Sequence, residues 1–354
     1  KRLIRIKDLS VIQASGSLQV GAVSLIDDTA EPYRALLKAF PDVIASSLKN
    51  CIPKHPIVHE IETKGPPIFS RPRNLDPVKL KAAKKEFKEL LDAGIVERSR
   101  SPYASPLHMV KKKDNTWRPC GDYRRLNAIT VPDRYPLPRI SHLSANLKGA
   151  KYFTRLDITK AYHQIPMGEG SKGKTSIVTP FGSFQYLRMP FGLRNAGASF
   201  QRLIDITISE LDFAFAYVDD ILIFSSTEEQ HIKDVQQVMQ RLRENGLFIN
   251  PKKCLFGLRS IEFLGYIVDE TGIRPTPSNV AVINDFQAPT DIASLRRYLG
   301  IINHYRRFIK DAAEILRPLT DALKLDVSQG KANSGKSINH RLVFRWTDAM
   351  QNAF

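Results

Sequence analysis

Two adjacent carboxylates are the first candidates for chemistry in this chain. Asp219 and Asp220 lie between the apolar runs Phe213–Tyr217 and Ile221–Phe224, a pattern that predicts a β-hairpin with both acids at its tip. Adjacent carboxylates repel each other, and a hard divalent cation such as Mg²⁺, which prefers carboxylate oxygen, removes that repulsion. Aspartate is also a common turn residue, so this pair alone leaves a metal site and a plain turn equally open.

A third carboxylate follows a separate apolar run. Phe153–Leu156 is predicted to be a strand that leads into Asp157, whose carboxylate can converge with the acids of the hairpin. Nucleotidyl transfer with two metal ions needs such convergence, because the ions lie about 3.5–4 Å apart. The alternative for Asp157 is an N-cap, since Ile158–Ile165 is expected to be helical.

Amphipathic spacing predicts the helices that flank these strands. Val78–Ala93 has one apolar face and is followed by Gly94, which suits a helix cap. A second helix is expected to begin after Thr227 and to end at Gly246, with Gln230 placed for a capping box.

A third helical region is predicted at Ser294–Ala322, in two pieces because of Pro318. One face of it is apolar and another is polar and basic. The apolar face contains Leu295, Leu299 and Ile302, and the polar face contains Arg296, Asn303, Arg307 and Lys310.

Strands are predicted elsewhere by alternation between turn residues. Met109–Lys113 and Thr116–Tyr123, joined at Asp114-Asn115, suggest a basic hairpin, and further strands are expected within Phe263–Arg274. Short strands are expected at Leu3–Ile6 and Val20–Ile26, and a mobile loop at Asp326–His340.

Composition favours a polyanionic partner. Lys and Arg number 53 against 36 Asp and Glu in 354 residues, a net charge of +17, which suits nucleic acid first and an anionic membrane second. A merely basic soluble protein is the alternative. No apolar run approaches the roughly 20 residues of a membrane span.

The remaining global features concern the compartment and the chain ends. Cys51, Cys120 and Cys254 are too few and too scattered for a disulfide framework or a zinc site, which favours a reducing compartment. His55 and His59 have helical ligand spacing, but Pro56 argues against a zinc site there. The chain has no initiator Met and is expected to be cut from a longer polyprotein.

With these motifs in order, the chain resembles the reverse transcriptases of gypsy-type LTR retrotransposons from about His59 to Leu323. The Tyr217–Asp220 hairpin after the Leu156-Asp157 strand end resembles their palm. Further matching segments are Ser101–Pro106, Lys112–Asp114, Trp117-Arg118, Asp122–Arg124, Leu126-Asn127, Tyr162–Ile165, Met189–Leu193, Phe263–Tyr266 and Tyr305–Phe308.

The resemblance implies an α+β right-hand polymerase with fingers, a ferredoxin-like palm and a helical thumb. The expected parts are an N-terminal extension (1–50), fingers (51–150), palm (151–274, with a fingers insertion at about 166–190), thumb (275–325), and a loop and connection toward an RNase H domain (326–354).

The same resemblance implies roles at matching positions. Asp157, Asp219 and Asp220 would be the catalytic carboxylates and, with the Ile158 carbonyl, would hold two Mg²⁺ ions, for which Mn²⁺ can substitute. The residues expected to meet the deoxynucleoside triphosphate are Lys112, Arg118, Ile158, Thr159, Lys160, Ala161, Tyr162 and Phe191. Those expected to meet nucleic acid are Arg124, Tyr217, Leu264, Gly265, Tyr266, Arg296, Arg307 and Lys310.

Several of these residues have simpler explanations. Lys112 and Arg118 would, without the resemblance, be a solvated basic hairpin. Tyr162, implied to exclude a ribose 2′-hydroxyl, could be a core tyrosine, and the basic face of Ser294–Lys310 could be a solvated helix face.

Some positions depart from common family patterns. Phe191 replaces the Gln of many retroviral enzymes, which removes a side-chain hydrogen bond to the nucleotide but agrees with the gypsy type. Gly197, Thr276 and Phe286 stand where Pro, Asp and Trp are frequent. None of these three is a catalytic acid.

The resemblance implies a primed RNA or DNA template and deoxynucleoside triphosphates as substrates, and protease, RNase H and integrase modules of the same polyprotein as partners. It implies that the protein does not associate with membranes and that it acts in a cytoplasmic virus-like particle with nuclear passage. It leaves the oligomeric state open. Two alternatives are a non-catalytic nucleic-acid-binding remnant and a hydrolase that uses the Asp pair as acid and base. The second is disfavoured because successive strand residues point to opposite faces.

Overall fold

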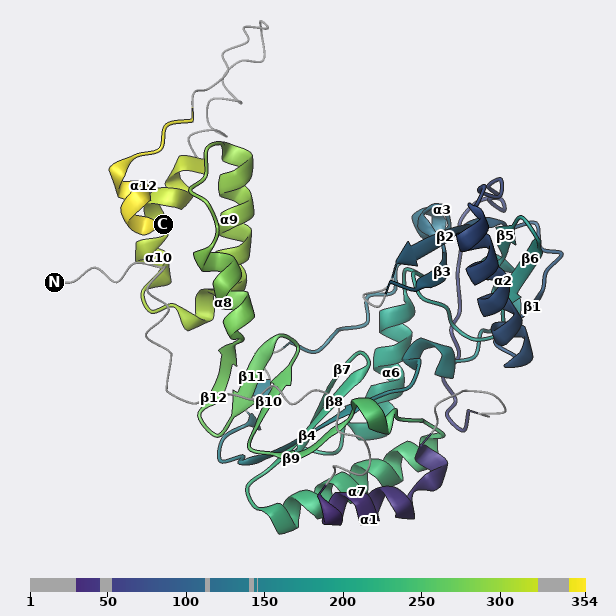
Figure 1. Ribbon diagram of the computed structural model, residues 1–354, viewed down its shortest axis with the longest axis horizontal. Coiled ribbons are helices and arrows are strands. Elements are labelled where there is room, and N and C mark those ends of the chain that lie inside the picture. The colour runs from purple at the N-terminus through teal and green to yellow at the C-terminus, as the bar shows by residue number, and fades with distance from the viewer. Residues whose placement is uncertain (1–29, 45–52, 112–114, 140–142, 145, 324–343) are drawn as a thin grey trace, which may run out of the picture. The chain divides into compact units, whose positions relative to one another are not determined.

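The computed structural model describes residues 30–44, 53–111, 115–139, 143, 144, 146–323 and 344–354 (Figure 1). The chain divides into two compact units, whose described parts are residues 30–261 and 262–354. The strands predicted at Leu3–Ile6 and Val20–Ile26 and the loop predicted at Asp326–His340 lie outside the described residues. Within the described ranges, no helix is long and apolar enough to cross a membrane.

A four-stranded antiparallel sheet lies in the first unit. Its strands and the two helices between them are β4 (Tyr152–Asp157), α6 (Ala196–Ile208), β7 (Ala214–Tyr217), β8 (Asp220–Ser225), α7 (Glu228–Asn245) and β9 (Leu255–Leu258). The strand order is β7-β8-β4-β9, with antiparallel neighbours throughout. This is the βαββαβ arrangement of a ferredoxin-like fold, as predicted.

Helix α7 packs against this sheet through one apolar face. Val235, Val238, Met239 and Leu242 are fully buried, and their i, i+3, i+4, i+7 spacing is that of a single helix face. The Thr227 hydroxyl accepts a hydrogen bond from the N–H of Gln230 at 3.3 Å. The C-terminal end of α7 is capped by Gly246, which has a φ of 64° in the left-handed conformation. Helix α1 (Glu31–Ala39) and the 3₁₀ turn η3 (Pro41–Val43) contact α7.

A five-stranded sheet forms a separate part of the same unit (Figure 1). Its strands are β1 (Val96–Arg98), β2 (Ser105–Lys111), β3 (Trp117–Gly121), β5 (Ile177–Thr179) and β6 (Gly182–Tyr186), in the order β1-β6-β5-β2-β3. Helix α2 (Pro77–Asp92) lies alongside it in Figure 1 and buries Ala83, Phe87 and Leu90. Asp76 caps α2 and Gly94, φ 64°, follows its end, so the predicted helix is confirmed. The predicted hairpin is β2–β3, and its residues 112–114 lie outside the described ranges.

Short helical elements lie in the connections, all of them between the two sheets except η6, which lies between α7 and β9. They are α3 (Arg124–Ile129), η4 (Ala161–Gln164), α5 (Glu169–Lys172), η5 (Gly173–Thr175) and η6 (Pro251–Lys253). The helical segment predicted at Ile158–Ile165 is wrong in extent, because only η4 forms there. Ile158 instead pairs with Ile249 in an isolated β-bridge, so tertiary pairing overrides the local helical tendency.

The second unit has its own core. Its elements are β10 (Ser260–Phe263, in which the division between units falls), β11 (Tyr266–Asp269), β12 (Gly272–Pro275), α8 (Pro277–Asn284), α9 (Ile292–Tyr305), η7 (Arg306–Phe308), α10 (Ala312–Ile315) and α12 (Asp348–Ala353). Leu295, Leu299 and Ile302 are buried in it, which confirms the predicted apolar face of α9.

The helical region is interrupted beside Pro318, as predicted, because α10 ends at Ile315 and Leu316 is a turn residue, and it is also interrupted earlier. Helix α9 ends at Tyr305, η7 follows, and Asp311 has a left-handed φ of 55°. Residues 317–323 are helical, and Pro318 stands near their start, where a missing N–H costs no helical hydrogen bond. Arg307 and Lys310 therefore lie beyond α9 and do not share one continuous helix face with Arg296 and Asn303.

Candidate active site

Backbone pairing brings three carboxylates to one end of the four-stranded sheet. Asp157 ends β4 and pairs in register with Asp220, the first residue of β8. Asp219 lies in the tight connection between β7 and β8, and its carbonyl oxygen accepts a hydrogen bond from the Ile158 N–H at 3.0 Å. Residues more than 60 positions apart in the sequence thus form one acidic cluster.

The tip of this hairpin is strained. Val218 has a φ of 51°, in a left-handed region that a β-branched residue rarely adopts. Such strain costs on the order of 1–3 kcal/mol and persists only where surrounding structure fixes it. Here the register of Tyr217 with Asp220 and the Ile158 hydrogen bond supply that constraint.

Asp219 carries a buried oxygen without a partner. Its Oδ1 accepts no hydrogen bond from any described residue. Burial, followed by the nearby carboxylates of Asp220 and Asp157, raises the pKa of Asp219 to about 6. An ionised Asp219 is therefore costly unless a positive ligand approaches it.

The other two carboxylates each face a cation. Lys253 Nζ lies 3.6 Å from Asp157 Oδ2, and Arg155 Nε lies 4.0 Å from Asp220 Oδ1. Burial raises the pKa of both carboxyls, and the neighbouring cations oppose that rise. The cluster is thus partly neutralised from within the chain.

The donor set suits a hard divalent cation. Three carboxylates, one with an unpartnered buried oxygen, provide the oxygen ligands that Mg²⁺ prefers. In the described part of the chain, no three His, Cys, Asp or Glu side chains are close enough together to form a complete metal site. The three carboxylates would therefore have to move closer together to hold one ion.

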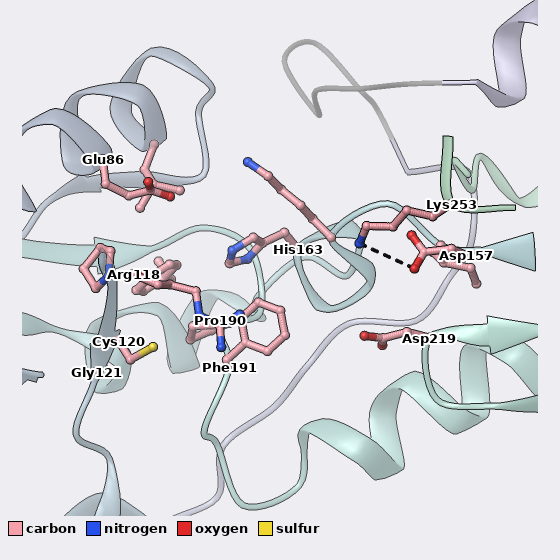
Figure 2. A pocket seen from close by; sticks show the side chains of 15 residues that line it. Glu86, Arg118, Cys120, Gly121, Asp157, His163, Pro190, Phe191, Asp219 and Lys253 are labelled. Carbon is pink, nitrogen blue, oxygen red and sulfur yellow. Dashed lines mark ion pairs between the residues drawn. The ribbon is translucent and has the colours of Figure 1, made fainter. Parts of the chain in front are cut away.

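A cavity of about 400 Å³ opens beside the acids. Figure 2 shows Asp157, Asp219 and Lys253 on one side of it, and Glu86, Arg118 and Cys120 on the other. The Arg118 guanidinium lies 5.5 Å from the centre of the Phe191 ring, and Tyr162 packs against the same ring at 5.0 Å between centroids. The cavity is acidic on one side and basic and aromatic on the other.

Known proteins with similar sequences show which family the chain belongs to. The family described as reverse transcriptase (RNA-dependent DNA polymerase) matches residues 110–268. The Drosophila melanogaster retrovirus-related Pol polyprotein from transposon opus is 38% identical over 83% of this chain and 30% of its own length. This chain belongs to the reverse transcriptases of retrotransposon Pol polyproteins. The Pol polyprotein from transposon gypsy of the same species is 38% identical over 76% of this chain and 26% of its own length.

This chain spans less than a third of the length of these relatives. The transposon Tf2-3 polyprotein of Schizosaccharomyces pombe is 35% identical over 82% of this chain and 22% of its own length. Among solved structures, a foamy viral protease-reverse transcriptase in complex with double-stranded DNA has a TM-score of 0.75 at 21% identity, covering 96% of this chain and 60% of that one. The fold is therefore that of reverse transcriptases, as predicted.

The residues expected to meet the nucleotide are distributed around the cavity. Arg118, Ile158, Lys160 and Phe191 line it, whereas Lys112 lies outside the described residues. Tyr162 is half-buried, and its edge meets Phe200 at 5.9 Å. Its ring is thus fixed by two aromatic neighbours, Phe191 and Phe200.

Among Ile158–Ala161, which are expected to meet the nucleotide, two backbone N–H groups are already engaged. The Ile158 N–H donates to Asp219, and the Thr159 N–H donates to the Phe248 carbonyl at 2.9 Å. Lys160, with a left-handed φ of 44°, precedes η4, and Ala161 begins it.

The residues expected to meet nucleic acid fall in both units. In the first unit Tyr217 ends β7, and Arg124 is exposed but paired with Asp122, 2.6 Å between Nη2 and Oδ2. In the second unit Leu264 and Gly265 form the β10–β11 turn with left-handed φ values of 52° and 78°. Tyr266 is only 4% exposed, so its side chain acts inside the unit.

The Tyr266 ring is part of an aromatic cluster in the second unit. Its hydroxyl hydrogen-bonds His304 Nε2 at 2.8 Å, and its ring meets Phe308 and the Arg307 guanidinium. Arg296, Arg307 and Lys310 are exposed in this unit.

Sequence reasoning missed several residues of the site. Lys253 lines the cavity beside Asp157, and the Cys254 thiol accepts a hydrogen bond from the Asp157 N–H at 3.3 Å. His163 lines the cavity and stacks on Tyr186. The signal available for Lys253 was a basic pair directly after Pro251, but nothing in the sequence links it to a strand nearly 100 residues earlier.

Proposed function

We propose that this chain is the polymerase part of a Pol polyprotein and that it synthesises DNA from deoxynucleoside triphosphates on a primed RNA or DNA template. The observation that carries the proposal is the convergence of Asp157, Asp219 and Asp220 beside a cavity whose opposite side holds Arg118. Family membership supports it. So do the foamy viral structures of the same fold, which are complexes with double-stranded DNA and with an RNA/DNA hybrid.

The reaction is an in-line displacement. The primer 3′-hydroxyl oxygen forms a bond to the α-phosphorus, the bond from that phosphorus to the bridging oxygen breaks, and pyrophosphate leaves. The hydroxyl proton passes to solvent. The chain contributes mainly positioning and charge, since phosphoryl transfer needs little covalent chemistry from the protein.

Asp157, Asp219, Asp220 and the Ile158 carbonyl would hold two Mg²⁺ ions, with Mn²⁺ as a substitute. When bound, such ions lower the cost of the charge that develops on the attacking and leaving oxygens. Their binding would also relieve the unpartnered oxygen of Asp219. Lys253 would be released from Asp157 as the site fills.

The nucleotide would lie across the cavity. Arg118 would contact its triphosphate with a planar fork of N–H donors, together with Lys112 and the amides of Lys160 and Ala161. Tyr162, held between Phe191 and Phe200, would occupy the space that a ribose 2′-hydroxyl needs.

We assign the polymerase parts as fingers (51–150 and about 166–190), palm (the rest of 151–274) and thumb (275–325), after an N-terminal extension (1–50). Residues 326–354 would lead to an RNase H domain, with protease and integrase modules on the same polyprotein. Arg124 would contact the template, and Tyr217, Leu264, Gly265, Arg296, Arg307 and Lys310 the primer–template duplex. The enzyme would act in cytoplasmic virus-like particles, with nuclear passage of its product.

Primer extension tests the proposal. The parent chain should extend an oligo(dT) primer on poly(rA) with Mg²⁺ or Mn²⁺, and extension should stop when a chelator is added. The Asp219→Asn variant should not extend the primer. Duplex affinity, measured by fluorescence anisotropy, should be equal for the two proteins because Asn keeps the shape of Asp.

Two results would contradict it. Duplex binding without extension by the parent would favour the non-catalytic alternative. Phosphate or glycosidic hydrolysis that survives the chelator and needs Asp219 would favour the acid–base hydrolase.

A further inference from the structure

One aromatic side chain of the first unit points into solvent. Phe69 is 68% exposed, and among the described residues no other Phe, Tyr or Trp falls in the exposed class. Burying a Phe side chain is worth about 1.5–3 kcal/mol, so such exposure suits a surface that is covered by a ligand.

The backbone around Phe69 is fixed although its ring is not. Ala104 donates to the Ile68 carbonyl at 3.0 Å and accepts from the Ser70 N–H at 2.8 Å, and Arg125 Nη1 donates to the Phe69 carbonyl at 2.6 Å. Ile68, the preceding residue, packs against the core. The ring is thus presented on a segment that is held by an isolated β-bridge to Ala104 and not on a free loop.

The segments around Phe69 carry more cations than acids. Segments 62–76 and 121–130 contain five cations and three acids, Glu62, Asp76 and Asp122. Asp122 is already paired, because Arg73 and Arg124 both lie within hydrogen-bonding distance of its Oδ2, at 2.5 and 2.6 Å. The cations are Lys64, Arg71, Arg73, Arg124 and Arg125.

This surface continues from the candidate active site. Gly121, at the end of β3, lines the cavity, and Asp122 with its two arginines follows directly. Arg125, the second residue of α3, reaches the Phe69 backbone carbonyl and, at 3.1 Å, the Ser70 hydroxyl. A strand that leaves the cavity past Gly121 would meet these cations and then the exposed ring.

We propose that Phe69, with Arg71, Arg73, Arg124 and Arg125, forms a stacking platform for the unpaired template bases ahead of the polymerase site. An exposed aromatic ring within a basic surface is the combination that binds single-stranded nucleic acid, because the ring stacks on a base while the cations meet phosphates. The proposal rests on the proposed function for the direction in which the template runs. It names single-stranded nucleic acid, not duplex or protein, as the occupant.

The test is equilibrium binding in EDTA without nucleotides, so that it needs no catalysis. Three labelled primer–template duplexes of the same sequence serve as probes. The first has a blunt template end, the second has a 5′ template overhang of about eight nucleotides, and the third has an abasic overhang of equal length. The parent should bind the base-containing overhang at least about fivefold more tightly than the abasic one, the lower range for stacking on an aromatic ring.

Matched variants separate the ring from its surroundings. Phe69→Ala should bind the base-containing and abasic overhangs with equal affinity, while its affinity for the blunt duplex stays the same. Phe69→Trp should keep the preference of the parent for the base-containing overhang. Val78→Ala, an equally exposed apolar residue at 67%, should behave as the parent.

The inference is overturned if the parent shows no gain from overhang bases, or if Phe69→Ala keeps it. Equal loss of blunt-duplex and overhang binding in Phe69→Ala would also overturn it. If the gain depends on Phe69 but the parent extends no primer, the platform stands and the proposed polymerase activity fails.

Discussion

The two sides of the cavity are built in different ways. On the acidic side, the backbone of β4, β7 and β8 fixes Asp157, Asp219 and Asp220 by register and by the Ile158 hydrogen bond. On the basic side, Arg118 extends from β3 and is held by packing of its guanidinium over Phe191. Backbone pairing sets the acids, whereas side-chain packing sets the residues opposite them.

This difference separates two tasks. Metal binding requires carboxylates at fixed mutual distances even though they repel, and only a paired backbone holds them so. Nucleotide binding requires contacts that form and release in every cycle, which suits long side chains on a hairpin. Substitutions on one side should therefore impair one step and spare the other.

The largest effect is expected from a substitution on the acidic side of the cavity. Asp157→Asn should slow single-turnover primer extension on the order of 10³-fold, because a neutral amide would hold the proposed metal ions less well and these would stabilise the developing charge. Duplex affinity should stay within about twofold. Glu86→Gln, a carboxylate of the opposite wall, is the matched control and should extend normally. Equal loss in both variants would show that the acids of the cavity act only through general charge.

The next effect breaks the basic side. Arg118→Ala should raise KM for deoxynucleoside triphosphates about 10- to 100-fold, the loss expected for charged hydrogen bonds worth about 1.5–3 kcal/mol. Arg118→Lys should recover part of this, since it restores the charge without the planar fork. Steady-state kinetics at saturating duplex would show it. A rise in duplex Kd with unchanged KM would move Arg118 out of the nucleotide site.

A smaller effect sharpens the aromatic part of the basic side. Tyr162→Ala should weaken discrimination against ribonucleotides by about tenfold or more, because a vacated ring volume admits the 2′-hydroxyl. Tyr162→Phe keeps the ring between Phe191 and Phe200 and should keep the discrimination. The ratio of kcat/KM for dTTP and rUTP measures this, and an unchanged ratio in Tyr162→Ala would assign Tyr162 to packing alone.

The pH dependence of thermal stability tests the electrostatic cost of the buried Asp219 carboxylate on the acidic side. The folded pKa of Asp219 is raised to about 6, above the unfolded value, so the folded chain binds more protons between about pH 4 and 6. Stability from this group is therefore present at low pH and is lost as pH rises through that window. Without metal, Asp219→Asn should raise the Tm, and more at about pH 7 than at about pH 4.5. A parent Tm advantage at neutral pH would contradict the burial argument.

Local signals were enough to predict much of this architecture. The acids between two apolar runs predicted the β7–β8 hairpin, and Thr227 and Gly246 predicted the ends of α7, because caps and turns depend on neighbouring residues only. The ferredoxin-like arrangement came from the family resemblance.

What the sequence did not reveal depends on distant contacts. Lys253 meets Asp157 only because β9 pairs with β4. The helix break directly after α9, at residues 306–311, contains no proline that would predict it. The pairing of Arg155 with Asp220 follows from strand register, which single-strand patterns do not give. The closure of the cavity by Arg118 and Phe191 likewise joins elements far apart in sequence.

The smallest effect should touch neither side of the cavity. Gly197 lies in the first turn of α6, and a Cβ built there meets nothing within 4 Å. Gly197→Ala should therefore stabilise the chain by about 0.4–1 kcal/mol, by restricting the unfolded state and favouring the helix. Urea unfolding would measure it, and extension should be unchanged. Destabilisation would mean that α6 needs the glycine for a contact absent from this structure.

Mn²⁺ binding followed by electron paramagnetic resonance, with saturating duplex, tests the central claim most directly. The parent and Arg118→Ala should bind Mn²⁺ alike, whereas Asp219→Asn should bind it at least about tenfold more weakly, since this substitution removes a charged ligand from the cluster. Equal Mn²⁺ affinity in the parent and Asp219→Asn would show that the acids are not the metal site.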